Sequence, residues 1–283
     1  MSGLMVALVL FAAFMHALWS TLIKSNGQAK ANTTVFMACS AFLALFGLPF
    51  LPFPSLDSLP FLLASVVIQA GYMMLVGVIY QKGDVSQSYP VMRGVPPLLI
   101  ALVSGPLLGE KLSLVGIFGV ILISLGTLSL LIEAVKRVDR IDRSGVPLSL
   151  LTALFVAMAT VFDGVGIRLS AAPISYILWI FVLIGAFRIV VEIYNKNSRI
   201  RFWGHLQQYW PLGLFAGLLS LGAYGFPLWA MTQLPVAFVA ALRESSIFFV
   251  ILLSCFVLHE KIGLLRSISS SLIVFGVIAV RLA

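Results

Sequence analysis

Long apolar runs alternate with short polar stretches along the whole chain. Windows of about 20 predominantly apolar residues predict ten membrane-crossing helices. These windows cover residues 4–23, 33–51, 60–81, 85–108, 113–133, 146–167, 174–194, 209–231, 235–258 and 262–282. The polar stretches between the windows are short and leave no room for a separate soluble domain. We therefore predict an all-α polytopic membrane protein with ten transmembrane helices.

The composition agrees with this class of protein. Hydrophobic residues make up 61% of the chain and charged residues only 10%, whereas a soluble domain carries about a quarter charged residues. This composition argues against a soluble enzyme. Cys39 and Cys255 fall within predicted helices and lack the spacing of metal ligands, so we expect neither a metal ion nor another cofactor.

The second half of the chain repeats part of the first half. Residues 81–133 align without a gap with residues 231–283, and 10 of the 53 aligned positions are identical. Three of the identical pairs are charged: Arg93 with Arg243, Glu110 with Glu260, and Lys111 with Lys261. The repeat predicts two five-helix units, residues 1–135 and 146–283, which are joined by a charged cytoplasmic linker at residues 136–145.

An odd number of helices in each unit has a consequence for topology. The second unit must enter the membrane upside down relative to the first, which makes the two units an inverted-topology repeat. Inverted repeats place a substrate site near the midplane, between the halves, and permit alternating access when one half rocks against the other. The architecture therefore favours transport of a small-molecule substrate.

Lysine and arginine residues outside the predicted helices favour one side of the membrane. The loops after the first, third, fifth, seventh and ninth helices hold twelve of them, and the opposite side holds three. By the positive-inside rule, we expect those loops in the cytoplasm and both termini outside, in a bacterial-type inner membrane. The net charge of +8 then reflects topology and contact with an anionic lipid surface, and we expect no binding of nucleic acid.

Two arginines lie deep within predicted helices. Arg93 follows Asp84 by nine residues and Arg243 follows Pro235 by eight, which places them roughly 14 Å and 12 Å from opposite membrane faces. A charge at that depth is costly and is retained mainly where it meets a partner, a cavity or a ligand. We expect both arginines to bind substrate. The alternative is that they pair with Glu244 and backbone carbonyl groups as structural ties.

The helix around Arg93 cannot be regular. Pro90, Pro96 and Pro97 each remove a backbone donor and disturb the preceding turn, and a discontinuous helix beside an arginine is typical of a transporter site for an anionic group. No proline lies near Arg243, so we expect the two halves to differ chemically. Further polar and aromatic side chains are predicted to line the cavity, with helix packing as their alternative role: His16, Trp19, Gln69, Tyr72, Ser86, Tyr89, Tyr224 and Glu244.

Two side chains are candidates for proton coupling. His16 lies about eight residues inside its helix, and histidine is the side chain best suited to carry a proton near neutral pH. Asp163 lies five residues before Arg168, close enough to the helix end to reach water by snorkelling. The alternatives are a hydrogen-bonded packing role for His16 and an interfacial position for Asp163.

The sequence resembles a known superfamily through several motifs. They are His16-Ala17-Leu18-Trp19, Gly83-Asp84-Val85-Ser86 followed by Tyr89-Pro90 and Arg93-Gly94, and Gly109-Glu110-Lys111-Leu112, whose Glu-Lys pair recurs at Glu260-Lys261. Together with ten helices in two five-helix units, these motifs resemble the EamA-type drug/metabolite transporter superfamily. The resemblance implies secondary transport of small metabolites, usually export of amino acids or related solutes. It also implies a central cavity lined by the first, third and fourth helices of each unit.

The repeated Glu-Lys turns are expected to be structural. A carboxylate at Glu110 or Glu260 is placed to cap the N-terminus of the helix that follows it, with Lys111 and Lys261 beside it. Small residues in the fifth and tenth helices predict close helix approach, either within one chain or between two chains of a homodimer.

Two other classes of function remain as alternatives. A membrane enzyme acting on lipid-linked substrates would need paired carboxylates, a metal site, or a nucleophile with a base at a membrane face, and the acids here are few. A receptor or assembly subunit could use the same fold without transport. No Gly-x-x-x-x-Gly-Lys-Ser/Thr motif for ATP is present in the sequence, so energy must come from a gradient, unless transport is passive.

Overall fold

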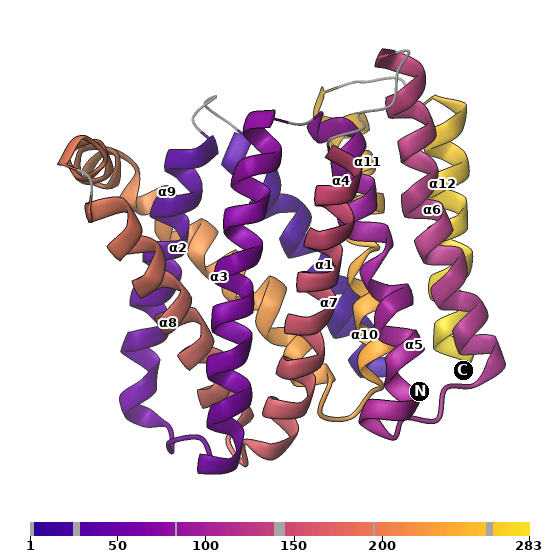
Figure 1. Ribbon diagram of the computed structural model, residues 1–283, viewed down its shortest axis with the longest axis horizontal. Coiled ribbons are helices and arrows are strands. Elements are labelled where there is room, and N and C mark those ends of the chain that lie inside the picture. The colour runs from indigo at the N-terminus through magenta and orange to yellow at the C-terminus, as the bar shows by residue number, and fades with distance from the viewer. Residues whose placement is uncertain (1–2, 25–28, 83, 139–144, 195, 259–262) are drawn as a thin grey trace.

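A computed structural model describes residues 3–24, 29–82, 84–138, 145–194, 196–258 and 263–283 of the chain. The described residues form a helical bundle with ten helical segments long and apolar enough to cross a membrane, which confirms the predicted class and number of spans (Figure 1). The first half contains α1 (Gly3–Lys24), α2 (Ala29–Gly47), α3 (Leu59–Lys82), α4 (Val85–Gly94), α5 (Pro96–Leu108) and α6 (Leu114–Val138). The second half contains α7 (Gly145–Leu169), α8 (Pro173–Tyr194), α9 (Lys196–Ala230), α10 (Val236–Arg243), α11 (Ser246–Leu258) and α12 (Leu264–Leu282). Two short 3-10 turns, η1 (Leu48–Phe50) and η2 (Leu56–Ser58), connect α2 to α3.

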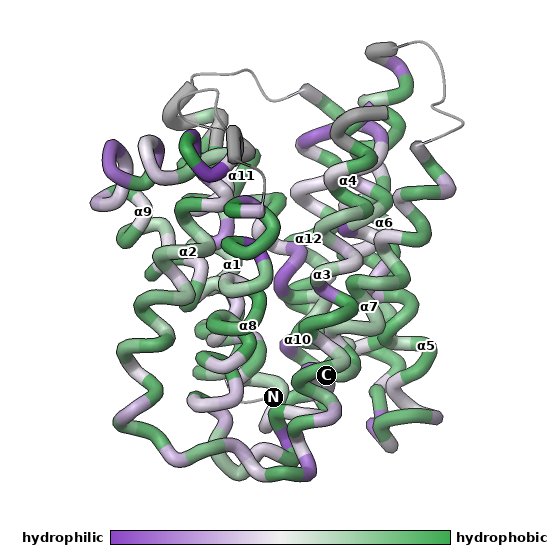
Figure 2. Tube along the Cα trace, turned by 60° about the vertical axis from the view of Figure 1, so that its left-hand side comes forward, coloured by the Kyte–Doolittle hydropathy of each residue, from purple (hydrophilic) through white to green (hydrophobic). Residues whose placement is uncertain are grey.

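The third span of the second half is longer than its hydropathy predicted. We expected it to begin at residue 209, but α9 already begins at Lys196 and runs for 35 residues. Its first part lies at one edge of the upper end of the bundle (upper left in Figure 1), and it contains several hydrophilic residues (Figure 2). His205 in this part is buried, and its Nε2 lies 2.8 Å from Oδ1 of Asn32 in α2. This contact between polar groups attaches the segment to the neighbouring helix.

The fourth span of each half is interrupted at equivalent positions. α4 ends at Gly94 and α10 ends at Arg243. Val95 interrupts the first of these spans and Glu244–Ser245 the second. The two interruptions are about 150 residues apart, which is the shift of the sequence repeat. Proline explains the first break, because Pro96 and Pro97 have no N–H to donate to the preceding turn. The sequence predicted this break and missed the second one.

Serine chemistry accounts for the second break. The carbonyl oxygen of Leu242 accepts hydrogen bonds from both the backbone N–H and the hydroxyl of Ser245, at 3.1 and 2.7 Å. The N–H groups of Glu244 and Ile247 likewise bond three residues back instead of four. A serine side chain that bonds to the backbone competes with the regular helical pattern, so the helix is interrupted here without any proline.

The two halves of the bundle interlock. α3 packs against α7, and α9 packs against α1, so the third span of each half lies against the first span of the other half. α1 and α7 run in opposite directions between the two ends of the bundle, and both chain termini lie at its lower end (Figure 1). The centre of the molecule, where the two interrupted spans face each other, is therefore built from both halves.

Small residues bring α6 and α12 together at one edge of the bundle. A Cβ atom at Gly276 would lie 2.6 Å from Cγ1 of Ile123 and 2.8 Å from the carbonyl oxygen of Gly119, so only glycine permits this approach. The Ser269 hydroxyl also donates to the carbonyl oxygen of Gly126, at 2.5 Å. The close approach that the sequence predicted is thus made within one chain.

We predict that Gly276→Ala destabilises the protein by about 1–3 kcal/mol, because the added methyl group overpacks the α6–α12 contact. Thermal unfolding in detergent should show a clearly lower midpoint. Gly77→Ala is the matched control, because Gly77 also lies within a helix and a Cβ atom there would meet nothing within 4 Å. Equal midpoints for the two variants would contradict the tight contact.

Candidate functional site

The centre of the molecule contains an ion pair between the two halves. Arg93, near the end of α4, places its Nε 3.1 Å from Oε2 of Glu244, the residue that follows α10. Its Nη2 donates to the Ser246 hydroxyl, at 3.0 Å. The two side chains of the pair are only 20% and 8% exposed. Both breaks are therefore joined through Arg93, which supports the structural role that the sequence left as an alternative for this residue.

Arg243 differs from Arg93 in its contacts. Its Cζ lies 5.0 Å from the centre of the Tyr224 ring, in the range of a cation–π interaction. Among the described residues, its guanidinium makes neither a hydrogen bond nor an ion pair within 4.0 Å. The donors of Arg243 are thus available to a ligand, whereas Nε and Nη2 of Arg93 already contact Glu244 and Ser246.

Asp163 lies in the buried centre, although its distance from the helix end also allowed an interfacial position. The side chain is completely buried in α7. The Tyr224 hydroxyl donates to its Oδ2 at 2.5 Å, and Nε2 of Gln69 lies 3.5 Å from the same oxygen. Its other oxygen, Oδ1, has no hydrogen-bond partner. Tyr224 therefore connects Asp163 with Arg243.

Other predicted residues surround the two arginines. Electrostatic interactions join His16 with Arg93 and Arg243, and join Arg93 with Tyr72 and Tyr89. The ring centres of His16 and Trp19 are 5.6 Å apart. The indole Nε1 of Trp19 is buried and has no hydrogen-bond partner, so it is a donor that a ligand could use.

Ser86 is not brought into this cluster. It lies in the first turn of α4 and is exposed, and its backbone N–H and hydroxyl both donate to Oδ1 of Asp84, at 2.9 and 2.6 Å. Seven residues separate it from Arg93, roughly 10 Å along a helix. Its contacts are those of a helix cap.

The prediction for Glu110 was wrong about which helix it caps. Its carboxylate accepts hydrogen bonds from the N–H of Val236, at 2.9 and 3.1 Å, so it caps α10 of the other half and not the helix that follows it. Pro235 at the N-cap of α10 makes no side-chain cap hydrogen bond, whereas α4 has Asp84. A remote carboxylate therefore supplies what the local sequence lacks.

Arg168 completes this contact at the lower end of the bundle. Its Nη2 lies 2.6 Å from Oε1 of Glu110, and its guanidinium also donates to the carbonyl oxygens of Met231 and Leu234, at 2.8 and 3.1 Å. We call Glu110, Arg168 and the α9–α10 turn the lower clasp. Lys111 beside it is exposed. The equivalent Glu260 and Lys261, and residues 139–144 of the predicted linker, lie outside the described residues.

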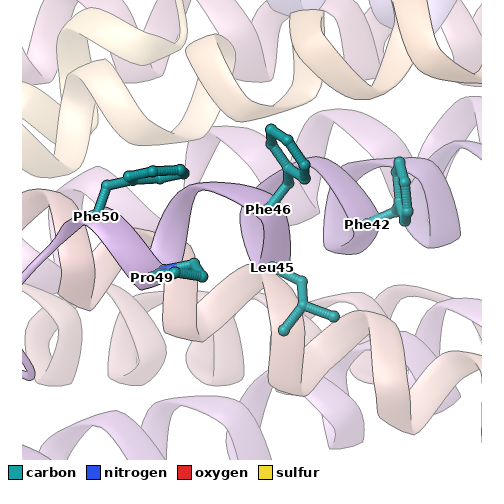
Figure 3. Close-up of a pocket in the computed structure, with 5 residues that line it drawn as sticks. All are labelled: Phe42, Leu45, Phe46, Pro49 and Phe50. Carbon is teal, nitrogen blue, oxygen red and sulfur yellow. The ribbon is translucent and has the colours of Figure 1, made fainter.

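The surface also has a hollow of about 250 Å³ whose lining is apolar, unlike the polar centre. It is lined by Phe42, Leu45, Phe46, Pro49 and Phe50 of α2 and η1 (Figure 3). All five are hydrophobic, and the four phenylalanine and leucine side chains among them that face outward are more than half exposed. Such a surface suits lipid chains and has no group that recognises a polar solute.

Sequence reasoning missed three polar partners of the cluster and the clasp. Ser246 binds Arg93, Ser65 accepts from Gln69 at 2.9 Å, and Arg168 binds Glu110. The Ser246–Arg93 and Arg168–Glu110 contacts join residues 153 and 58 positions apart, so no local pattern could reveal these two.

Among the described residues, no group of three or more His, Cys, Asp or Glu side chains is arranged to hold a metal ion.

The fold and the buried charges together define an all-α, multi-pass membrane protein with a polar centre. One solved structure, titled only "Crystal structure of protein", shares 16% sequence identity with the chain, with a TM-score of 0.72. The similarity covers 99% of this chain and 96% of that one, and at this identity it shows the fold alone. A search of curated proteins found no match.

Residues 143–282 match the EamA-like transporter family. With its ten membrane helices, the chain belongs to the EamA-type drug/metabolite transporter superfamily. This is a superfamily of transporters, so the protein is a membrane transporter of small solutes.

We predict that Glu110→Gln lowers the free energy of unfolding by about 1–3 kcal/mol, because a charged hydrogen-bond partner of Arg168 and of the α10 cap is lost. Arg168→Gln should have a similar effect. The double variant should be less damaging than the sum of the two, because the residues are in direct contact. Thermal unfolding in detergent measures all three.

A more exposed ion pair provides the control for this cycle. Arg266 and Glu133 lie 3.3 Å apart, with side chains 25% and 21% exposed, and such pairs contribute at most about 1 kcal/mol. Arg266→Gln should therefore shift the midpoint little. Strict additivity of Glu110→Gln and Arg168→Gln would refute the lower clasp.

Proposed function

We propose that this protein is a secondary transporter that exports small anionic or zwitterionic metabolites, such as amino acids, by alternating access. The solute binds between the halves, near the two helix breaks. Export is the direction that the resemblance to the superfamily favours.

One observation carries the substrate class. An available guanidinium, that of Arg243, lies in the buried centre beside a second arginine that is already paired. A guanidinium recognises a carboxylate, phosphate or phosphonate through two parallel hydrogen bonds. Tyr72, Tyr89, His16 and Trp19 would surround the rest of the solute with aromatic faces and polar tips, the usual lining of a small-molecule site.

The two breaks support the alternating-access mechanism. A break leaves backbone groups without helical partners and lets the two parts of a span tilt separately. Arg93 connects the breaks through Glu244 and Ser246, so a tilt at one break is transmitted to the other. The lower clasp would hold the lower end closed, and its release would accompany opening on that side. The two halves would act as the inverted repeats that the sequence predicts.

The same arrangement supports an orientation in a bacterial-type inner membrane. Both termini lie at the end of the bundle opposite the hydrophilic upper end (Figures 1 and 2). We propose that the upper end is cytoplasmic and that the termini are outside.

The small-residue faces of α6 and α12 are used within one chain, so a homodimer would need another surface.

We predict that Arg243→Gln lowers solute exchange at least tenfold while the protein remains folded, because the ligand loses a charged bidentate partner. Counterflow in proteoliposomes, with a panel of amino acids, organophosphonates and other small organic anions, would measure it. Arg93→Gln should instead destabilise the fold, because it leaves Glu244 buried without its partner.

The double variant Arg93→Gln/Glu244→Gln is the control for that difference. It removes both charges of the pair, so it should recover much of the stability lost in Arg93→Gln. Equal exchange by wild type and Arg243→Gln, for every solute of the panel, would show that the available arginine is not the binding site.

We predict that the C-terminus lies outside the cytoplasm, so that a reporter fused to it is active only if that reporter requires the outside compartment. Alkaline phosphatase fused after Ala283 should be active, and a fluorescent protein that folds only in the cytoplasm should not be. The same pair fused after Lys24 provides the control and should give the opposite result. A fluorescent C-terminal fusion would reverse the proposed orientation.

A further inference from the structure

Among the described residues, the buried centre contains two positive and two negative side chains. Arg93 and Glu244 form a direct ion pair, so their charges cancel within the pair. In the part of the chain that the structure describes, Arg243 and Asp163 form no ion pair within 4.0 Å, and Tyr224 lies between them, with its ring against the guanidinium and its hydroxyl bound to the carboxylate. The charge that an incoming solute meets therefore depends on whether Asp163 is ionised.

We propose that Asp163 is the proton-binding site of this transporter, and that an anionic solute at Arg243 moves across the membrane together with one proton. This inference rests on the proposed function. It selects one of the two candidate proton carriers, and it specifies the stoichiometry and the sign of the coupling.

The geometry gives the physical reason. With Asp163 ionised, its charge balances Arg243, and an added anion would leave the buried site with excess negative charge. With Asp163 protonated, the site has one uncompensated positive charge, which a monoanion neutralises. In a medium of low dielectric constant a net charge is costly, so proton and anion are expected to bind together.

The contacts of Asp163 suit this exchange. Oδ2 already accepts from Tyr224 and lies near Gln69, and the Ser65 hydroxyl lies close to the carboxylate. Oδ1 is buried and accepts no hydrogen bond, so a proton can be added to that oxygen without displacing a donor from it. The bond from Tyr224 to Oδ2 persists in both states, because a protonated carboxyl group still accepts at its other oxygen.

The groups around Asp163 come from several helices. Tyr224 of α9, Tyr176 of α8 and Arg243 of α10 interact with it electrostatically. The neighbouring α3 contributes the uncharged Gln69 and Ser65. Several other charged groups on elements packed against α7 have partners: Arg93 of α4 binds Glu244, Arg168 of α7 itself binds Glu110, and Arg188 of α8 donates to the Thr34 hydroxyl. Asp57 of η2 and Arg199 and Arg201 of α9 are exposed, Glu192 of α8 lies near the end of its helix, and α5 has no charged residue. The charge of Asp163 therefore acts mainly on Arg243, whose positive charge it compensates when it is ionised.

His16 is a poorer carrier for a proton. It interacts with Arg93 and Arg243, so protonation would add a third positive charge beside two guanidinium groups. A neutral imidazole can instead donate or accept one hydrogen bond to the solute. The structure therefore separates the two candidates that the sequence could not rank.

Coupled movement of one proton with one monoanion is electrically neutral. A pH gradient, acidic on the side from which the solute enters, should then drive accumulation, and a membrane potential alone should not. A gradient that is acidic outside opposes export by this route, so net export requires an internal concentration of the solute high enough to exceed it.

The test uses the full-length protein in proteoliposomes, with a monoanion that exchanges in the counterflow panel. One pH unit should support up to about tenfold accumulation by wild type, because each proton contributes a factor of ten per unit. Asp163→Asn should lose this pH-driven accumulation. It should instead move the anion alone, so that a potassium diffusion potential set with valinomycin drives its uptake, while counterflow remains measurable. Asp57→Asn, an exposed aspartate outside the site, should behave as wild type.

The outcomes separate this inference from the proposed function. No exchange of any solute by wild type would refute the transport proposal itself. Exchange with a normal pH response in Asp163→Asn would overturn only the proton site. If Asp163→Asn does not fold or exchange, a pH-sensitive dye trapped inside wild-type vesicles tests the coupled proton: one proton entering per solute supports the coupling, and none overturns the inference.

Discussion

The structure depends on the pairing of charges that hydrocarbon and protein shield from water. A charge in such a place is retained only when a partner compensates it. Arg93 meets Glu244, Arg168 meets Glu110, and Arg243 meets the ring of Tyr224, whose hydroxyl in turn binds Asp163. The first two contacts join one half to the other, and the third connects α10, α9 and α7 within the second half. The ion pairs therefore hold the two halves in register, and the proposed mechanism uses the same charged groups.

Backbone symmetry and side-chain asymmetry coexist in the centre. The breaks after Gly94 and Arg243 lie at equivalent places in the repeat, one caused by proline and the other by the hydrogen bonds of Ser245. The two arginines at these breaks are equivalent in position but differ in their contacts. One stabilises the junction between the halves, and the other leaves its donors available. An interruption in both halves, with one arginine available to a ligand, is compatible with the proposed alternating access to a single site.

The Glu110 contact shows how the two halves depend on each other. α10 begins after a proline and has no local cap, so its first N–H group takes a carboxylate from the opposite half. Removing that carboxylate would weaken a helix that carries Arg243 at its other end.

The apolar hollow on α2 has no polar side chain and shows that an indentation in the surface of a membrane protein need not be a substrate site.

Hydropathy alone was sufficient for the ten spans, because the cost of exposing the polar backbone or charged side chains to lipid applies at every residue and is therefore readable locally. The repeat and the expected depth of Arg93 and Arg243 were also inferred from the sequence, since helix rise converts residue number into distance. The partner of each charge was not. Arg93 could equally have been a binding residue and Asp163 an interfacial one, and Glu110 was assigned to the wrong helix. Those assignments depend on contacts between segments 58 to 153 residues apart, which only the packing of the helices decides.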